Sequence, residues 1–274
     1  MGTEPGIRTL VCFHAHPDDE AIATGGSMAK AAAAGHRVVL VVATKGEHGE
    51  VAEGFLDDGE PLEARRVVET HAAAEILGVS RVEFLGYVDS GMIGTPENDG
   101  PQSFWQADVD EAARRLAAIL TEEQADVLTA YDENGVYGHP DHIQVYRVGV
   151  AAGRMAGTPK IYLNTVNRDF LQREMERMAE SGAEPPGDID PAELRELGVP
   201  EDRITTAVDV GEFVTVKRRA MAAHASQISE TSFFLAMPEE MFAAGFGTEW
   251  YMLDGAAPGT SETDLFEGLD GRTA

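Results

Sequence analysis

The chain has 274 residues, 43% of them hydrophobic, which suits one large or two small globular domains. Its formal net charge of −27 would repel phosphate backbones and anionic membrane surfaces, so we expect neither nucleic acid nor membrane as a partner. The single cysteine, Cys12, excludes an intramolecular disulfide, as in a reducing compartment. The chain shows neither a signal-peptide pattern nor an apolar run of membrane-spanning length. We therefore expect a cytoplasmic protein, and the sequence leaves open whether it forms a homo-oligomer.

Predicted strands and helices alternate along the first 165 residues. Strands are predicted at 9–13, 37–43, 82–85, 127–130 and 160–163, and helices at 21–34, 61–77, 108–123 and 143–156. The stretch RVVLVVA at 37–43 is typical of a parallel strand covered on both faces. This alternation predicts an α/β fold, a Rossmann-like, doubly wound, mostly parallel sheet. In such sheets ligands bind at the carboxyl ends of the strands.

The rest of the chain breaks this alternation. We assign 1–165 to a Rossmann-like catalytic core and 166–254 to a cap and C-terminal elements of the same domain. This second part holds a charged helix at 169–181, a proline-rich stretch at 184–188, a short helix from Pro191, a helix at 214–228 and an apolar segment at 233–246. The acidic stretch 255–274, rich in small residues, is expected to be a loosely ordered tail.

Two groups of side chains suited to metal binding follow predicted strands. HAHPDDE at 14–20 comes directly after the first strand, and YGHPDH at 137–142 comes after the fourth. Imidazole nitrogen and carboxylate oxygen are the ligands of Zn²⁺ sites that keep an open position for water. Because both groups follow strands of one parallel sheet, we expect them to form one shared site.

The spacing within the two groups suggests a division of roles. His16 and Asp19, three residues apart at a turn, can converge on one ion, which leaves Asp18 free to accept a proton from activated water. A third ligand is required, and either His142 or His139 can supply it. The remaining histidine is then available as a cation that stabilises an oxyanion or protonates a leaving amine.

Each group alone has a simpler explanation. Acidic residues are common at helix N-termini, and His-Pro is common in turns. Both groups at the ends of predicted parallel strands favour a functional site instead. Glu47 follows the second strand and so is expected to line the same edge of the sheet.

The two motifs resemble the signatures of the PIG-L/LmbE-like zinc-dependent deacetylases. HAHPDDE is similar to the AHPDDE motif of that family, and YGHPDH to its second, HPDH-type motif. The likeness covers about residues 8–165. Within the family it is nearest to the mycothiol-pathway deacetylase and the mycothiol S-conjugate amidase, and the stretches 131–135 and 223–227 look like the amidase branch.

The resemblance implies a role for each matching residue. Zn²⁺ would be bound by His16, Asp19 and His142, and Asp18 would be the general base. His139 would be a cationic group held by Asp141.

Further positions correspond to substrate contacts in the family. Tyr137 matches a mobile tyrosine that polarises the amide carbonyl, and Arg66 and Asp89 match substrate-binding positions. A helix-surface ion pair for Arg66 and a turn for Asp89 are the alternatives. Glu20 could cap the loop, and His14 has no assigned role.

We therefore predict a zinc-dependent amidohydrolase that removes an acyl group from an N-acylated amino sugar or glycoconjugate. A mycothiol S-conjugate-type amidase on the same site is the nearest alternative. A nucleotide-binding module lacks support because no glycine-rich phosphate loop follows the first strand, and a non-catalytic metal-binding protein is the remaining possibility. The same ligands would also accept Fe²⁺, Co²⁺ or Mn²⁺.

Overall fold

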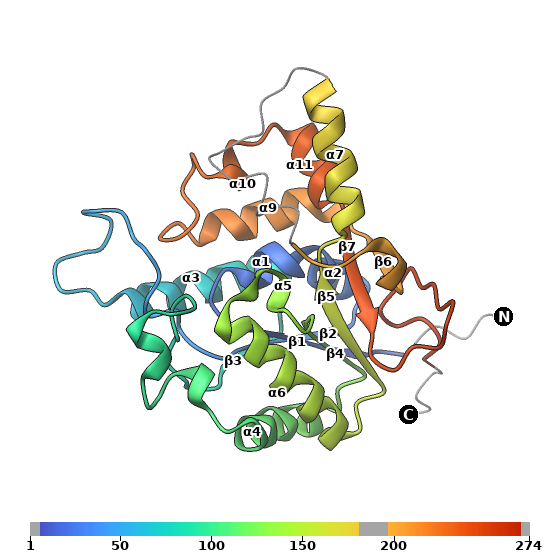
Figure 1. The fold of residues 1–274 in the computed structure, drawn as a ribbon, viewed down its shortest axis with the longest axis horizontal. Coiled ribbons are helices and arrows are strands. Elements are labelled where there is room, and N and C mark those ends of the chain that lie inside the picture. The colour runs from blue at the N-terminus through green and yellow to red at the C-terminus, as the bar shows by residue number, and fades with distance from the viewer. Residues whose placement is uncertain (1–5, 181–196, 270–274) are drawn as a thin grey trace.

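One seven-stranded sheet runs through residues 6–180 and 197–269, the part of the chain that this computed structural model describes (Figure 1). Its strand order is β3-β2-β1-β4-β5-β7-β6. The strands are β1 (Thr9–His14), β2 (Arg37–Val42), β3 (Arg81–Phe84), β4 (Val127–Tyr131), β5 (Lys160–Thr165), β6 (Thr206–Asp209) and β7 (Thr248–Leu253). β1 to β5 are parallel, whereas β7 runs antiparallel to both β5 and β6. The predicted α/β fold with a mostly parallel sheet is confirmed.

Helices cover both faces of the sheet. They are α1 (Asp19–Ala23), α2 (Gly25–Ala33), α3 (Leu62–Leu77), α4 (Val109–Glu122), α5 (Gly135–Gly138), α6 (Pro140–Ala156), α7 (Arg168–Glu180), α9 (Val214–Ala223), α10 (Phe233–Ala236) and α11 (Glu239–Phe246). One continuous helix was expected at 21–34, but Thr24 breaks it into α1 and α2 because its backbone (φ −130°, ψ 8°) is not helical.

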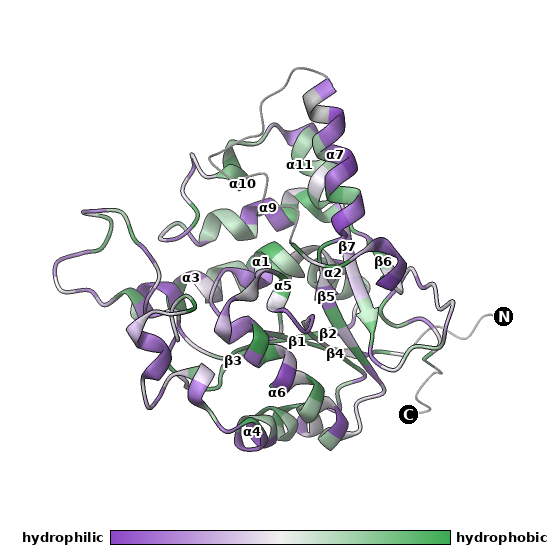
Figure 2. Ribbon diagram, in the orientation of Figure 1, coloured by the Kyte–Doolittle hydropathy of each residue, from purple (hydrophilic) through white to green (hydrophobic). Residues whose placement is uncertain are grey.

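The alternation of side chains along β1 divides the core into two layers. Val11 and Phe13 pack with residues of α4 and α6 on one face. Leu10 and Cys12 point the other way, into a cluster with residues of α2, α3 and α9. Figure 2 shows the apolar strands inside and more hydrophilic residues on the outer parts of the helices. Both faces of the central strands are therefore buried, as the β-branched sequence of β2 indicated.

The C-terminal part of the chain contributes to the sheet itself. β6 and β7 were not predicted, and they extend the sheet beyond β5. Figure 1 shows α7, α9, α10 and α11 grouped on the side of the molecule away from α4 and α6. The proline-rich stretch 184–188 and the helix expected from Pro191 lie outside the described residues.

Residues 255–269 differ from the loose tail that their composition suggested. Leu265 is buried, and the ring of Phe266 lies 4.3 Å from that of His36. Glu262 pairs with Lys160 of β5 at 2.6 Å. This segment is therefore packed against the sheet.

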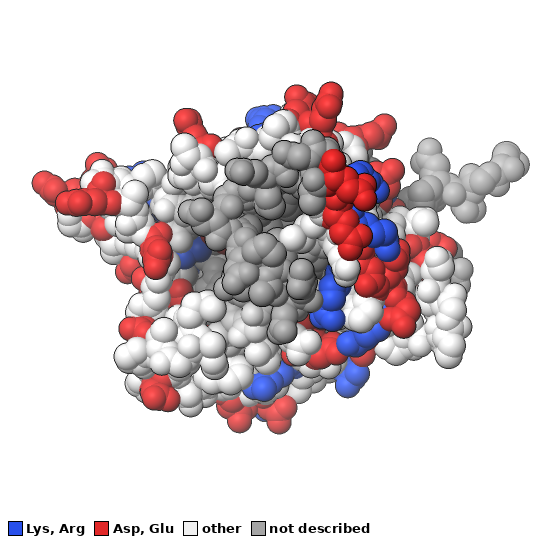
Figure 3. All heavy atoms as spheres, turned by 45° about the horizontal axis from the view of Figure 1, so that its top comes forward, with Lys and Arg blue, Asp and Glu red and all other residues white. Residues whose placement is uncertain are grey.

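The face drawn in Figure 3 carries many acidic side chains around its periphery and fewer basic ones, in keeping with the net charge of −27. None of the helices within 6–180 and 197–269 combines the length and the apolarity needed to cross a bilayer.

Candidate active site

The two predicted metal-binding loops meet at one point of the sheet. β1 pairs with β2 on one side and with β4 on the other, so the chain reverses its direction of winding between β1 and β4. Loops that leave neighbouring parallel strands at such a reversal diverge and leave a crevice between them. The loop after β1 carries the HAHPDDE motif, and the loop after β4 leads through α5 into the HPDH motif at the start of α6. Segments more than a hundred residues apart are thus brought together.

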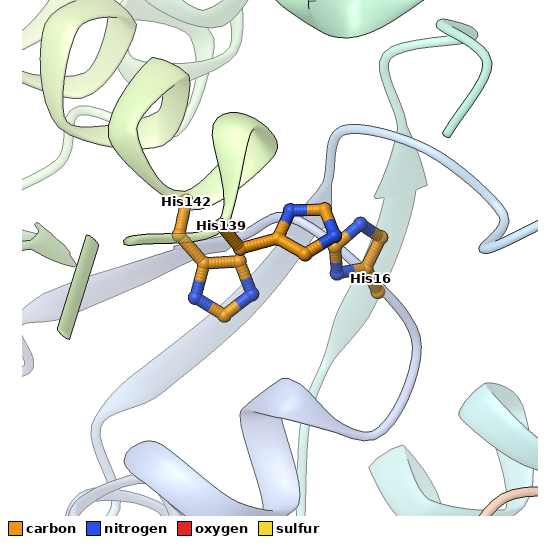
Figure 4. A group of neighbouring side chains, drawn as sticks. All are labelled: His16, His139 and His142. Atoms are coloured by element: carbon orange, nitrogen blue, oxygen red, sulfur yellow. The ribbon is translucent and has the colours of Figure 1, made fainter. Parts of the chain in front are cut away.

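Three buried histidines form the centre of this site (Figure 4). The ring centroids of His16 and His139 are 4.7 Å apart, those of His139 and His142 are 5.3 Å apart, and those of His16 and His142 are 5.4 Å apart. One nitrogen atom from each ring lies within 4.8 Å of the other two. A second set of donors, from His16, Asp89 and Asp141, meets the same criterion. The site is therefore rich in metal-ligating atoms.

Asp19 lies between two of these histidines. Its Oδ2 is 3.4 Å from Nδ1 of His16 and 3.4 Å from Nε2 of His142. Both separations are long for hydrogen bonds. They match the distance of about 3.4 Å between neighbouring ligand atoms of a tetrahedral ion with bonds of about 2.1 Å. Both separations around Asp19 are thus of the size expected between two ligands of one ion.

Asp141 orients His16 from the side opposite to Asp19. Its Oδ2 is 3.1 Å from Nε2 of His16, and its carboxylate also accepts hydrogen bonds from the backbone and hydroxyl of Ser90. A carboxylate on the far nitrogen of a metal-binding histidine is the usual device that fixes its ring and tautomer. Burial disfavours the charged form of His16, but the contacts with Asp141, Asp19 and Asp89 outweigh it and raise its pKa well above the ordinary value.

His139 differs from the expectation in two respects. Its contact with Asp141 is made by the backbone N–H of Asp141, which donates to Nδ1 of His139 at 3.1 Å, while the Asp141 carboxylate bonds elsewhere. Burial, together with the nearby rings of His16 and His142, lowers the pKa of His139 to about 4. A pKa this low favours a neutral imidazole at position 139 over the expected cation. Because Nδ1 accepts a hydrogen bond, Nε2 carries the proton.

Asp18 lies beside the donor set. Burial raises the pKa of its carboxyl to about 6 against the opposing effect of Arg66, whose Nη2 is 3.4 Å from Oδ2. A pKa near neutrality suits a group that exchanges protons during turnover. The backbone of Asp18 has a φ of 92°, a conformation that residues other than glycine rarely adopt.

The three predicted substrate-binding residues have well-defined internal contacts. Arg66 is only 3% exposed and donates to the carbonyl oxygens of Gly46 (2.8 Å) and Pro17 (2.6 Å), so a helix-surface ion pair is wrong. Asp89 accepts from the backbone N–H of Gly91 at 2.8 Å, as a turn residue would, and also lies 3.5 Å from His16.

Glu47 braces Asp89. Its Oε2 accepts from the backbone N–H of Asp89 at 3.0 Å. The loop after β2, which carries Glu47, is thereby joined to the loop after β3, which carries Asp89.

Tyr137 is 50% exposed, and its hydroxyl is 3.4 Å from Nε2 of His142. The preceding Val136 has a φ of 67°, which is strained for a β-branched residue. Gly135 approaches His142 so closely that an added Cβ would lie 2.5 Å from the Cβ of His142. The short helix α5 thus presents Tyr137 at the mouth of the site through an unusual backbone.

Sequence reasoning missed the support beneath the metal-binding side chains. His14 bonds to the Tyr131 hydroxyl at 2.7 Å and to Oγ1 of Thr24 at 2.8 Å, and burial lowers its pKa to about 4. The Tyr131 ring stacks on His142 with centroids 4.5 Å apart. The only signals in the sequence were the alternation of His14 with His16 and the position of Tyr131 just after a predicted strand.

Comparison with known proteins gives consistent matches. A family model described as "PIG-L: GlcNAc-PI de-N-acetylase" matches residues 11–153, more than half of the chain. A protein of Geodermatophilus obscurus named 1D-myo-inositol 2-acetamido-2-deoxy-alpha-D-glucopyranoside deacetylase is 40% identical over 290 residues, covering 96% of this chain and 99% of its own. A Thermomonospora curvata protein with the same name is 40% identical over 292 residues, covering 96% and 98%.

A solved structure shares the fold at lower identity. The N,N'-diacetylchitobiose deacetylase of Pyrococcus horikoshii superposes with a TM-score of 0.57 at 23% identity, covering 97% of this chain and 88% of that one.

Proposed function

We infer the function of this chain from one premise: it belongs to the PIG-L family of de-N-acetylases. It is a hydrolase that cleaves an amide bond and removes an acyl group from an N-acylated amino sugar. We propose that its substrate is a glucosaminyl inositol glycoside with an N-acetyl group, the compound after which the 40% identical relatives are named. The observation that carries the proposal is the set of donors His16, Asp19 and His142 with the carboxylate of Asp18, which contacts Arg66, beside it.

We propose that Zn²⁺ is held by His16, Asp19 and His142. When bound, the ion supplies Lewis-acid polarisation and makes water a better nucleophile at neutral pH. The separations of 3.4 Å from Asp19 to His16 and to His142 support this choice, and the set with three histidines is the alternative. A carboxylate among the ligands also offsets the positive charge, which three imidazoles would leave uncompensated.

Asp18 would act as the general base. It accepts a proton from the attacking water and returns it to the amine nitrogen as the C–N bond breaks, which yields acetate and the free amino sugar. Nε2–H of His139 would donate a hydrogen bond to the carbonyl oxygen as negative charge develops there. The hydroxyl of Tyr137, exposed at the mouth, would be a second donor to the same oxygen.

A thiol-conjugate amidase remains the second candidate, because residues 131–135 and 223–227 look like that branch. A substrate panel separates the two. The chain, stripped of metal and then reloaded with Zn²⁺, would be given the N-acetylglucosaminyl inositol, free N-acetylglucosamine and a cysteinyl amide conjugate. We expect free amine from the inositol glycoside only after metal is restored. Faster cleavage of the cysteinyl conjugate would establish the amidase, and no cleavage at full metal content would indicate a metal-binding protein without catalysis.

A further inference from the structure

The peptide group between Pro17 and Asp18 is held from both sides. Its carbonyl oxygen accepts from Arg66 at 2.6 Å, and its N–H donates to Oε2 of Glu20 at 3.0 Å. The orientation of this peptide group sets the φ of Asp18, which is 92°. This conformation is unfavourable for a residue other than glycine, and it persists only where neighbours enforce it. Arg66 and Glu20 are the neighbours whose hydrogen bonds fix the orientation of this peptide group.

Glu20 is in turn held by a residue from the far end of the chain. Its Oε1 lies 2.5 Å from Nε2 of His224, which follows the last residue of α9, and both side chains are fully buried. Since a carboxylate only accepts hydrogen bonds, Nε2 of His224 is the donor. Nδ1 of His224 has no hydrogen-bond partner among the described residues, so Glu20 is the one contact that its ring makes through hydrogen bonding there.

We propose that His224 and Glu20 are positioning residues for the general base. By fixing the Pro17–Asp18 peptide group, they hold Asp18 in the backbone conformation from which its carboxylate faces the attacking water. The inference rests on the proposed function, because it takes Asp18 to be the base. The route is His224 to Glu20 to the backbone of Asp18, and none of these contacts involves a proposed metal ligand directly.

A neighbouring contact provides a matched control. Two residues after His224, Ser226 donates to Glu69 of α3 through its backbone (2.9 Å) and its hydroxyl (2.6 Å). This pair is also buried and anchors the same segment, but it does not reach Asp18. If His224 only stabilised the fold, substitutions at His224 and at Glu69 would both lower stability and leave kcat per folded molecule unchanged. If His224 positions Asp18, only the substitution at His224 should lower kcat.

The test compares His224→Leu, His224→Gln and Glu69→Gln with the metal-loaded wild type. We expect His224→Leu to lower kcat by about 10- to 100-fold, the scale on which misplaced catalytic groups lose rate, with KM and metal content unchanged. His224→Gln should restore most of kcat, because its amide N–H can replace Nε2–H of the imidazole. Glu69→Gln should lower the unfolding temperature and leave kcat per folded molecule unchanged.

Several outcomes would overturn the inference. One is an unchanged kcat of folded His224→Leu, and another is a loss of rate that only follows a loss of metal. If His224→Leu does not fold, the isosteric Glu20→Gln decides by the same criteria, since Glu20 accepts from Asp18 and from His224 through different oxygens and the glutamine amide has only one. Asp18→Asn is measured in parallel. If Asp18→Asn is fully active, the proposed function fails, whereas an inactive Asp18→Asn beside a fully active His224→Leu refutes the positioning role alone.

Discussion

Single side chains of the site fall into those that face the candidate metal and those that orient them. His16, Asp19 and His142 belong to the first group. Asp141 belongs to the second group, because its carboxylate forms a hydrogen bond with Nε2 of His16. The HPDH motif shows that Asp141 lies near the site, but its partner is 125 positions away in the sequence. Local spacing could therefore suggest candidate metal ligands, but it could not predict the contact between Asp141 and His16.

Asp141→Asn tests this role. Loss of the charge on the far side of His16 should weaken metal binding by about 10-fold or more, the usual effect of removing such a partner. A chelator competition gives the affinity, and Asp110→Asn on the exposed surface of α4 is the control. Equal affinities for Asp141→Asn and the wild type would refute the assignment.

Elements that are distant in sequence are joined by a buried ion pair at β7, the strand next to the edge strand β6. Glu249 of β7 accepts hydrogen bonds from the backbone N–H groups of Gly26 and Ser27, at the start of α2, at 2.8 Å each. It also accepts one from Nζ of Lys217 in α9 at 2.6 Å. An anionic group at a helix N-terminus satisfies donors that the helix leaves free. This one strand residue thus links β7, α2 and α9.

Strand β7 also shows why the sequence predicted the parallel strands β1 to β5 but not β6 and β7, which extend the sheet. β1, β2, β4 and β5 carry apolar runs, and β3 alternates charged with apolar residues, so each can be identified without reference to other strands. β7 holds the buried charge of Glu249 and finds its pairing with β5 only in three dimensions. Similarly, the break at Thr24 follows from contacts such as its bond to His14, which helix propensity does not include.

We expect Lys217→Met, which removes the ion pair with Glu249, to lower the free energy of unfolding. It leaves Glu249 as a buried charge without its cation, which typically costs about 3–5 kcal/mol of the free energy of unfolding. The pair Arg154–Asp254, which is 2.8 Å long and has the Arg154 side chain 66% exposed, is the comparison, and Arg154→Met should cost at most about 1 kcal/mol. Chemical unfolding measures both, and similar losses for the two variants would contradict the expectation.

The whole molecule carries far more acid than base, with 48 Asp and Glu against 21 Lys and Arg. Such an excess keeps a protein soluble but destabilises its compact state through mutual repulsion. It does not bear on the fold, which the apolar pattern decides.

Salt should therefore stabilise the protein. Raising NaCl from about 10 mM to about 1 M shortens the screening length from about 30 Å to about 3 Å, which removes most long-range repulsion. We expect the unfolding temperature of the metal-loaded chain to rise over this range. A constant or falling unfolding temperature would show that local ion pairs outweigh the net charge.

Asp18 is proposed to act as the base beside a metal ion that it does not bind. Acetate release from the N-acetylglucosaminyl inositol, measured for the wild type and Asp18→Asn at equal metal content, tests it most directly. Asparagine is the chosen replacement because it is isosteric and tolerates a positive φ. We expect Asp18→Asn to retain its metal and to lose about 10²- to 10⁴-fold in kcat. Undiminished acetate release by metal-loaded Asp18→Asn would contradict it.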